Sequence, residues 1–450
     1  MRNRHNILFI AVLLITLLAS CSKDSIHGDG FSHTNTNKTE GGQRIELQEH
    51  RSLLLLYSAG YNSISEYLKE DINDIQKGWI PGTGIRENIL LIYSHFPAKR
   101  SDYSTPTSPT LTRISMDNDG GIIKDTLIVY PEGTHSATVE QLHEVLSHVK
   151  EKFPVKTYGM IFSSHASGYL PTGYYTAPDE YVFSAKDGMM FRPGARMQPS
   201  RPVPYVAPEH DPSLPAVKSI GQDQVGPLGN YASYEIELDD FAKALPMQME
   251  YILFDACLMG GVEVAYELKD KCRYVGFSQA EVLAEGFDYK TLVDHLLKSE
   301  IPDPQAVCED YFLQYDIQSG IYRSATISMV DCSRMQSLAQ TCRNLFDKYR
   351  KEIAWLSPGS VQRYFRSSYH WFYDLEDILV KAGITAEELA QLRESLDECM
   401  VYKASTPEFM GSFAIKTYSG LRMYLPCNGN AELDKYYRTL QWNIDTKLVE

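Results

Sequence analysis

The chain has 450 residues, and its 43 lysine and arginine residues against 58 aspartate and glutamate residues give a net charge of −15. A hydrophobic content of 43% is enough to fill a sizeable core, which excludes a largely disordered chain and a small disulfide scaffold. The acidic balance argues against a nucleic-acid partner, and the eight cysteines lack the Cys-x-x-Cys or Cys/His spacing of a zinc site, so no metal site is predicted.

The first predicted element is an export signal. Arg2 and Arg4 precede an apolar run over residues 7–18, which is too short to span a bilayer comfortably, and small residues follow just before Cys21. This ending resembles the bacterial lipobox, in which the cysteine becomes the lipidated first residue of the mature protein. We therefore expect residues 1–20 to be a lipoprotein signal peptide and the chain to be exported and lipid-anchored to a bacterial membrane, the outer membrane on its periplasmic or surface face. An ordinary signal peptide with a coincidental cysteine is the alternative.

A polar stretch over residues 21–48 predicts a flexible tether. From residue 49 to about 300, apolar runs alternate with stretches of helical periodicity, which predicts an α/β domain with a mostly parallel sheet flanked by helices on both faces. The expected strands are 53–57, 89–93, a hairpin over 111–130, 158–162, 251–254 and 274–277, and the expected helices are 64–75, 139–149, 261–269 and 292–297.

A proline-rich segment interrupts this pattern at residues 171–235, where ten of the chain's 22 prolines lie between Pro171 and Pro227. Proline removes backbone donors that a helix or central strand needs, so the segment is expected to be an exposed insertion. It carries five basic residues that bear on the argument below: Lys186, Arg192, Arg196, Arg201 and Lys218.

The alternation ends near residue 300, and residues 301–450 predict a C-terminal mixed α+β subdomain whose strands can extend the main sheet. Its expected strands are 325–330, 411–416 and 421–425, and its expected helices are 335–349, 364–382 and 386–401.

Two chemically active side chains follow predicted strands. His165 comes after the strand at 158–162, and Cys257 comes after the strand at 251–254. In a parallel sheet, ligands gather beyond the carboxyl ends of the strands, and an imidazole beside a thiol raises the fraction of nucleophilic thiolate. A buried structural cysteine and a hydrogen-bonded structural histidine are the alternatives, and His95, which also ends an apolar run, competes as the base.

The residues around both positions resemble the clostripain family of cysteine peptidases. The segment FDACLMGGVEVAYEL at 254–268 resembles that family's nucleophile region, and SSHASGY at 163–169 resembles its histidine motif. Further similarity is found in GFSQAE at 276–281, GFDY at 286–289, SATIS at 324–328 and GLRMYLP at 420–426. The resemblance implies a caspase-like α/β fold and a structural role for His95.

The resemblance also implies a mechanism. Cys257 is expected to attack the scissile carbonyl as a thiolate and form an acyl-enzyme, while His165 protonates the leaving amine and later helps to activate water. The backbone N–H groups of Cys257 and Ala166 are expected to bind the oxyanion. The family usually has glycine where this chain has Ala166, so the N–H donor requires an ordinary backbone conformation there. Tyr169 replaces the family's usual tryptophan.

The family cleaves after arginine, and sometimes lysine, and the resemblance assigns Asp255 to the base of the pocket that binds this side chain. A cap on the following helix or an anchor of the strand turn is the alternative role for Asp255. The expected partners are therefore protein or peptide substrates with Arg or Lys before the cut, and the membrane through the N-terminal lipid. No cofactor is expected; calcium is possible by family analogy, although no calcium-binding motif is found.

Three questions stay open in the sequence. Some family members cut themselves after a basic residue in the interval that matches 171–235, while a surface insertion that is never cut is equally compatible. A peptide-binding lipoprotein on a weakly active peptidase scaffold is the alternative function, motivated by Ala166. The six cysteines beyond Cys21 and Cys257 are expected to be buried thiols rather than disulfides.

Overall fold

The computed structural model describes residues 51–183, 199–205, 213–218, 223–227, 230–366, 371–428 and 430–450. All of them lie in one compact unit that spans residues 47–450. The predicted signal peptide and the whole predicted tether, including Cys21, lie outside the described residues. No helix in the described ranges is long and apolar enough to cross a membrane.

A nine-stranded sheet forms the centre of the unit, in the order β13-β11-β10-β9-β5-β1-β2-β3-β4. The five strands β10, β9, β5, β1 and β2 run parallel, and the antiparallel pairs β3-β4 and β11-β13 continue the sheet at its two edges. The predicted mostly parallel α/β sheet is confirmed, as is the hairpin. The strands are β1 Ser52–Ala59, β2 Ile89–His95, β3 Thr110–Met116, β4 Ile122–Val129, β5 Thr157–Ser163, β9 Met249–Asp255, β10 Cys272–Phe277, β11 Thr326–Asp331 and β13 Met400–Ser405.

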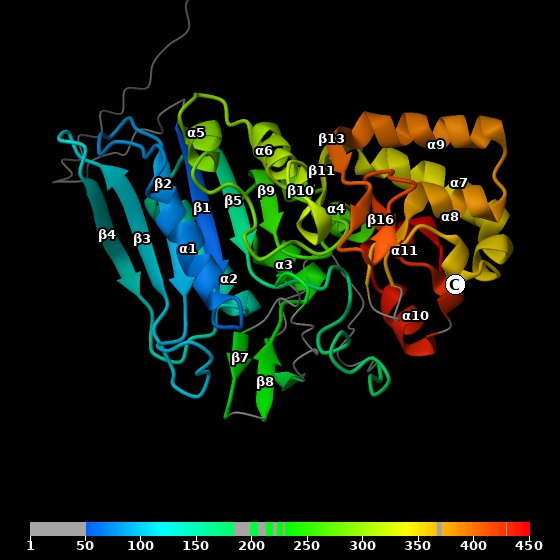
Figure 1. The fold of residues 1–450 in the computed structure, drawn as a ribbon, viewed down its shortest axis with the longest axis horizontal. Coiled ribbons are helices and arrows are strands. Elements are labelled where there is room, and N and C mark those ends of the chain that lie inside the picture. The colour runs from blue at the N-terminus through cyan, green and yellow to red at the C-terminus, as the bar shows by residue number, and fades with distance from the viewer. Residues whose placement is uncertain are drawn as a thin grey trace, which may run out of the picture. The chain divides into compact units, whose positions relative to one another are not determined.

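Helices cover both faces of this sheet, as the sequence predicts. Figure 1 shows α1, α5 and α6 on the near face, while α2, α3 and α4 pack against one another on the far face. Sequence-encoded caps fix two of these helices: the Thr138 side chain accepts the Gln141 N–H at the start of α2, and Asp303 accepts the Ala306 N–H at the start of α6. The helices are α1 Ser65–Ile75, α2 Val139–Lys152, α3 Leu238–Ala244, α4 Val262–Glu267, α5 Leu292–Leu297 and α6 Pro304–Asp316.

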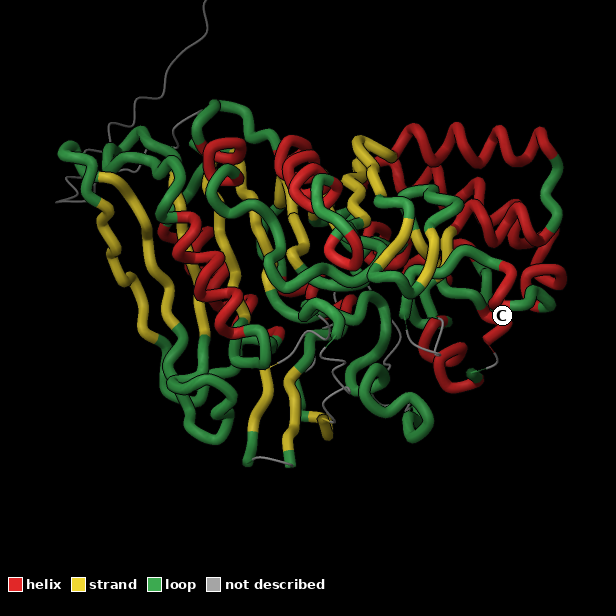
Figure 2. The backbone as a smooth tube through the Cα atoms, in the orientation of Figure 1, coloured by secondary structure: helices red, strands yellow, loops and turns green. Residues whose placement is uncertain are grey.

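The C-terminal residues add two edge strands, β11 and β13, and a helical layer. In Figure 2 the helices of this part lie beyond the β13 edge of the sheet. The predicted helix over 364–382 is wrong in its first half, because β12 pairs with β16 and Asp374 then caps α8 by accepting the Asp377 N–H. The elements are α7 Met335–Ala354, β12 Tyr373–Asp374, α8 Leu375–Ala382, α9 Ala386–Cys399, β14 Glu408–Phe409, β15 Phe413–Ala414, β16 Arg422–Met423, α10 Ala431–Tyr437 and α11 Gln441–Thr446.

The described parts of the proline-rich insertion contain a separate three-stranded antiparallel sheet. Its order is β6-β8-β7, formed by Val203–Tyr205, Tyr231–Tyr234 and Asp223–Val225. Among the basic residues of the insertion, Arg201 is exposed and Lys218 is fully buried, whereas the other three lie outside the described residues. The six remaining cysteines are free thiols, all buried except the partly buried Cys427.

Candidate active site

The strand register brings His165 and Cys257 to the same edge of the sheet. Ser163 at the end of β5 lies opposite Asp255 at the end of the neighbouring parallel strand β9. His165 comes two residues after Ser163, and Cys257 comes two residues after Asp255. Both are buried: 3% of His165 and none of Cys257 is exposed. The predicted placement at adjacent strand ends is therefore what the structure has.

The turn that carries Cys257 is fixed by contacts with the main chain of Val282 and contains one strained residue, Leu258. The Val282 N–H donates to the Cys257 Sγ at 3.0 Å, and the Sγ lies 3.6 Å from the Val282 carbonyl oxygen. Leu258, directly after the cysteine, has a φ of 60°, a left-handed conformation that costs roughly 1–2 kcal/mol for a residue other than glycine. The nucleophile turn is thus a sharp reversal imposed by its surroundings.

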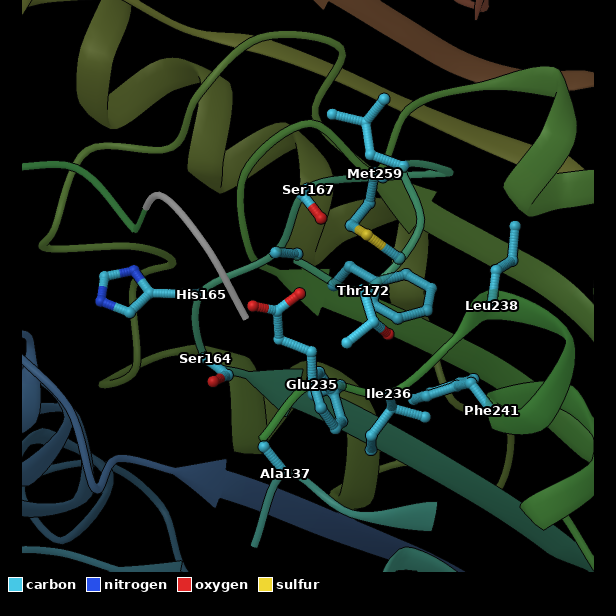
Figure 3. A pocket seen from close by; sticks show the side chains of 15 residues that line it. Ala137, Ser164, His165, Ser167, Thr172, Glu235, Ile236, Leu238, Phe241 and Met259 are labelled. Atoms are coloured by element: carbon cyan, nitrogen blue, oxygen red, sulfur yellow. The ribbon is translucent and has the colours of Figure 1, made fainter. Parts of the chain in front are cut away.

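His165 lies on the loop after β5 and contacts Ser63 through its Nε2, 3.1 Å from the Ser63 Oγ. Figure 3 shows the imidazole directed away from Ile236, Leu238 and Phe241, which line a cavity of about 60 Å³ beside this loop. Burial lowers the pKa of His165 to about 3; the main chain of Lys218 opposes the shift and the Lys218 ammonium adds to it. The ring is therefore neutral at physiological pH in this state.

Residues 213–218 of the insertion, the Lys218 segment, occupy the space in front of Cys257. The segment runs antiparallel to residues 282–284: the Lys218 N–H donates to the Val282 carbonyl at 2.9 Å, and the Ala284 N–H donates to the Ala216 carbonyl at 2.9 Å. At its end, the Lys218 carbonyl oxygen accepts the Cys257 N–H at 3.4 Å. An extended peptide is thus aligned with its Lys218 carbonyl at the nucleophile, as in recognition by strand addition.

The Lys218 side chain fills a buried pocket, here named the lysine pocket, formed by Asp71, Ser163, Asp255, Gly286 and Tyr289. Its ammonium contacts the Asp255 carboxylate, lies 3.2 Å from the Asp71 Oδ2, and donates to the Ser163 Oγ at 3.4 Å. Burial acts to lower the pKa of Lys218, but the two carboxylates raise it overall. The lysine is therefore held as a charged, wholly buried ammonium.

Asp255 lies at the base of this pocket and does not cap a helix. Its Oδ2 also accepts the Ser163 hydroxyl at 2.9 Å and the Tyr289 hydroxyl at 2.6 Å. The following helix, α4, begins at Val262 after Gly261, with no side-chain cap. The Asp255 carboxylate thus contacts the ammonium of a basic side chain from the same chain.

Asp71 and Ser63 are the residues of this region that the sequence analysis missed. A signal for Asp71 is present in the sequence, because it shares the buried face of α1 with Leu68 and Ile75, where a charged residue is out of place.

The backbone at Ala166 does not have a positive φ, so alanine fits this position without strain. His95 lies elsewhere: its Nδ1 is 3.1 Å from the Ser136 Oγ and 3.5 Å from the Asp223 Oδ2.

A largely parallel α/β sheet that presents a cysteine and a histidine at adjacent strand ends, with a peptide strand laid across them, defines the class of this protein as a cysteine-type peptidase. The model of the clostripain family matches residues 56–183 and 207–448, and the chain belongs to that family. Among curated proteins, no sequence matches this chain significantly.

Solved structures of similar fold include proteases from Parabacteroides distasonis and Bacteroides thetaiotaomicron. An inactive zymogen of a C11 protease from Parabacteroides distasonis is 24% identical, with a TM-score of 0.68 over 89% of this chain and 99% of the other. A secreted C11 cysteine protease from Bacteroides thetaiotaomicron is 21% identical, with a TM-score of 0.65 over the same shares. Its complex with an irreversible peptide inhibitor gives 20% identity and a TM-score of 0.65, again over 89% and 99%. The fold is therefore that of the C11 proteases.

Proposed function

We propose that the protein is an endopeptidase that cleaves after lysine or arginine through Cys257 and His165, and that it first cuts its own chain after Lys218. The observation that carries this proposal is the Lys218 segment, which lies as an added strand with its basic side chain in an acidic pocket and its carbonyl against the Cys257 N–H. A basic side chain wholly buried in this position is what a residue before the cut would require.

The proposed chemistry needs no group beyond the chain and water. The neutral His165 ring takes the proton of the Cys257 thiol, and the resulting thiolate attacks the carbonyl carbon. As the C–N bond breaks, His165 gives this proton to the leaving amine and a thioester remains. Water that His165 deprotonates then hydrolyses the thioester, and the proton returns to the released Cys257 sulfur. The N–H groups of Cys257 and Ala166 stabilise the oxyanion. The 3.4 Å contact between the Cys257 N–H and the Lys218 carbonyl supports one of these two donors. Within the described residues, no three His, Cys, Asp or Glu side chains could hold a metal ion, and no step uses one.

Self-cleavage would break the bond between Lys218 and Ser219 and free the site. While the Lys218 segment is in place, it buries His165 and fills the pocket that an external substrate needs. The uncut chain is therefore proposed to be a precursor with low activity toward other proteins. Lipid attachment at Cys21 would hold the precursor and the mature enzyme at the bacterial membrane.

Mass spectrometry of the intact protein tests both parts of the proposal. The wild-type chain should convert to two fragments that end at Lys218 and begin at Ser219, and Cys257→Ala should remain whole. The processed enzyme should cleave fluorogenic Lys and Arg amides and be labelled at Cys257 by a Lys-directed irreversible reagent. Equal amide cleavage by wild type and Cys257→Ala would refute the enzyme assignment, and peptide binding without labelling would favour the peptide-binding scaffold instead.

A further inference from the structure

Asp71 contributes a second carboxyl group to the lysine pocket. It comes from α1, which is far in sequence from the ends of β5 and β9 but reaches the same pocket. It lies on α1, with 7% of its surface exposed, whereas the neighbouring Glu70 points to solvent. Burial raises the pKa of Asp71 and the Lys218 ammonium opposes that shift, so the two groups depend on each other. A buried carboxylate of this kind is costly unless a cation compensates it.

The acceptors in the lysine pocket match an ammonium group. A lysine Nζ has three N–H donors, and three acceptors surround it: the Asp255 Oδ2, the Asp71 Oδ2 and the Ser163 Oγ. The acceptors come from three different elements and converge on one point. This arrangement suits a compact point charge, whereas a planar guanidinium pairs best with two oxygens of one carboxylate lying side by side.

The pocket also leaves little depth for a longer and wider group. The Lys218 ammonium is already in contact with Asp255 at the base, and the Asp255 Oδ2 is shared with Ser163 and Tyr289. Gly286 forms a wall so close that a Cβ there would lie 2.6 Å from the Lys218 Nζ and 2.5 Å from the Asp255 Oδ1. A guanidinium in the same pocket would have to displace one of these groups.

We propose that Asp71 is a specificity-determining residue that, together with Asp255, makes this pocket select lysine over arginine. The inference rests on the proposed function and narrows its substrate class. Asp255 alone would provide one carboxylate for either cation. Asp71 adds a second carboxyl oxygen at a position where the compact ammonium contacts both Asp71 and Asp255.

The test compares two fluorogenic peptides that differ only in Lys or Arg before the cut, using processed wild type, Asp71→Asn, Asp71→Glu and the control Glu70→Gln. If a variant does not cut itself, a trace of tagged wild-type enzyme is added to cut it after Lys218. The tagged enzyme is then removed by its tag. Wild type should show a higher kcat/KM for the Lys peptide. Because Asp71→Asn removes one of the two carboxyl groups that contact the buried ammonium, it should lose about 100-fold or more in kcat/KM on the Lys peptide, with a change of less than about fivefold on the Arg peptide.

Glu70→Gln should keep the wild-type ratio, and Asp71→Glu should restore part of the Lys preference, which a merely structural role for Asp71 would not predict. An equal loss on both peptides, or an unchanged Lys/Arg ratio in Asp71→Asn, would overturn the role of Asp71 while leaving the peptidase intact. If processed wild type cleaves neither peptide, the proposed function itself fails and this inference fails with it.

A second measurement requires no variant and therefore no assumption about folding. Butylammonium and butylguanidinium have the same alkyl chain and differ only in the cationic head, so their inhibition constants on the wild-type enzyme report the preference of the pocket. Butylammonium should inhibit at about tenfold or more lower concentration, as expected for a charged contact that only one head makes. Equal inhibition, or stronger inhibition by the guanidinium, would contradict the proposal.

Discussion

Replacing the Lys218 ammonium by a neutral group of similar size should release the Lys218 segment from the active site. Lys218→Gln removes a wholly buried charge that contacts two carboxylates and one hydroxyl, and it leaves the backbone pairing with residues 282–284 in place. The change therefore isolates the contribution of the lysine pocket from that of the added strand. The comparison is made in Cys257→Ala, where the chain should stay whole.

The magnitude follows from the class of interaction. Breaking a buried ion pair by removing one partner costs about 3–5 kcal/mol. Asp71 relieves part of this cost, because burial raises its pKa and it can take up a proton when the ammonium is gone. We therefore expect about 3 kcal/mol, which corresponds to about 100-fold in the equilibrium between the bound and released segment.

Hydrogen exchange measured by mass spectrometry reports this equilibrium directly. The amides of Lys218 and Ala284 donate across the pairing between the segment and residues 282–284, so both should exchange about 100-fold faster in Lys218→Gln. Amides of β1 should not change, which separates local release from global unfolding. Arg201→Gln, an exposed basic residue of the same insertion, should leave all of these rates unchanged.

Unchanged protection of the Lys218 and Ala284 amides in Lys218→Gln would refute the reasoning. It would mean that backbone pairing alone holds the segment and that the acidic pocket contributes nothing to its affinity. In that case the lysine pocket could not be the part of the site that selects the substrate side chain.

Three further predictions concern the surroundings of the site. Tyr289→Phe removes the hydroxyl that donates to the Asp255 Oδ2 at 2.6 Å, and the loss of a buried hydrogen bond to a charged group should lower kcat/KM for a Lys amide by roughly tenfold; an unchanged value would contradict this role. Arg422→Lys keeps the charge but loses the planar group that donates to the Leu258 carbonyl. The kcat should therefore fall by about tenfold or more at unchanged KM, because the nucleophile turn loses its support. A rise in KM alone would argue against an effect on the nucleophile. The pKa of His165 in the folded, uncut chain, about 3, is below its unfolded value, so the unfolded state binds the extra proton between about pH 6.5 and 3. Urea unfolding of Cys257→Ala should therefore show a stability that decreases as the pH is lowered through this window, by up to ~1.4 kcal/mol per pH unit more than in Cys257→Ala/His165→Asn. Equal slopes in the two proteins would exclude the effect.

The sequence predicts the sheet because the central strands are buried on both faces and therefore appear as continuous apolar runs. All eight residues of β1 are buried, and the same signal marks β5 and β9. Once those strands are placed, the parallel register brings the residues that follow them together, so the proximity of His165 and Cys257 could be predicted from sequence. Their catalytic roles and the role of Asp255 come from the resemblance to the clostripain family and stay predictions. The edge strand β13 could not, since its first residues continue the apolar spacing of α9 and only pairing with β11 makes them extended.

The residues missed in the site depend on contacts between distant segments. Lys218 is one of five basic residues in an irregular insertion, and what marks it out are its contacts with Asp255 and with Asp71, which is 147 residues away in the chain. Asp71 itself interrupts the apolar face of a helix, a pattern that indicates a buried charge but not its partner. The position of the proposed processing site therefore depends on tertiary contacts, which composition and periodicity do not contain.

Arg422 links the C-terminal part of the chain to the nucleophile turn. Its main-chain N–H donates to the Gly260 carbonyl at 3.0 Å, and its fully buried guanidinium, stacked 4.0 Å from the Phe372 ring centroid, donates to the Leu258 carbonyl. Leu258 is the strained residue that follows Cys257 and therefore needs such external support. A residue more than 160 positions after Cys257 thus supports the nucleophile turn, and the proposed cut after Lys218 would leave β9 and β16 together on the C-terminal fragment.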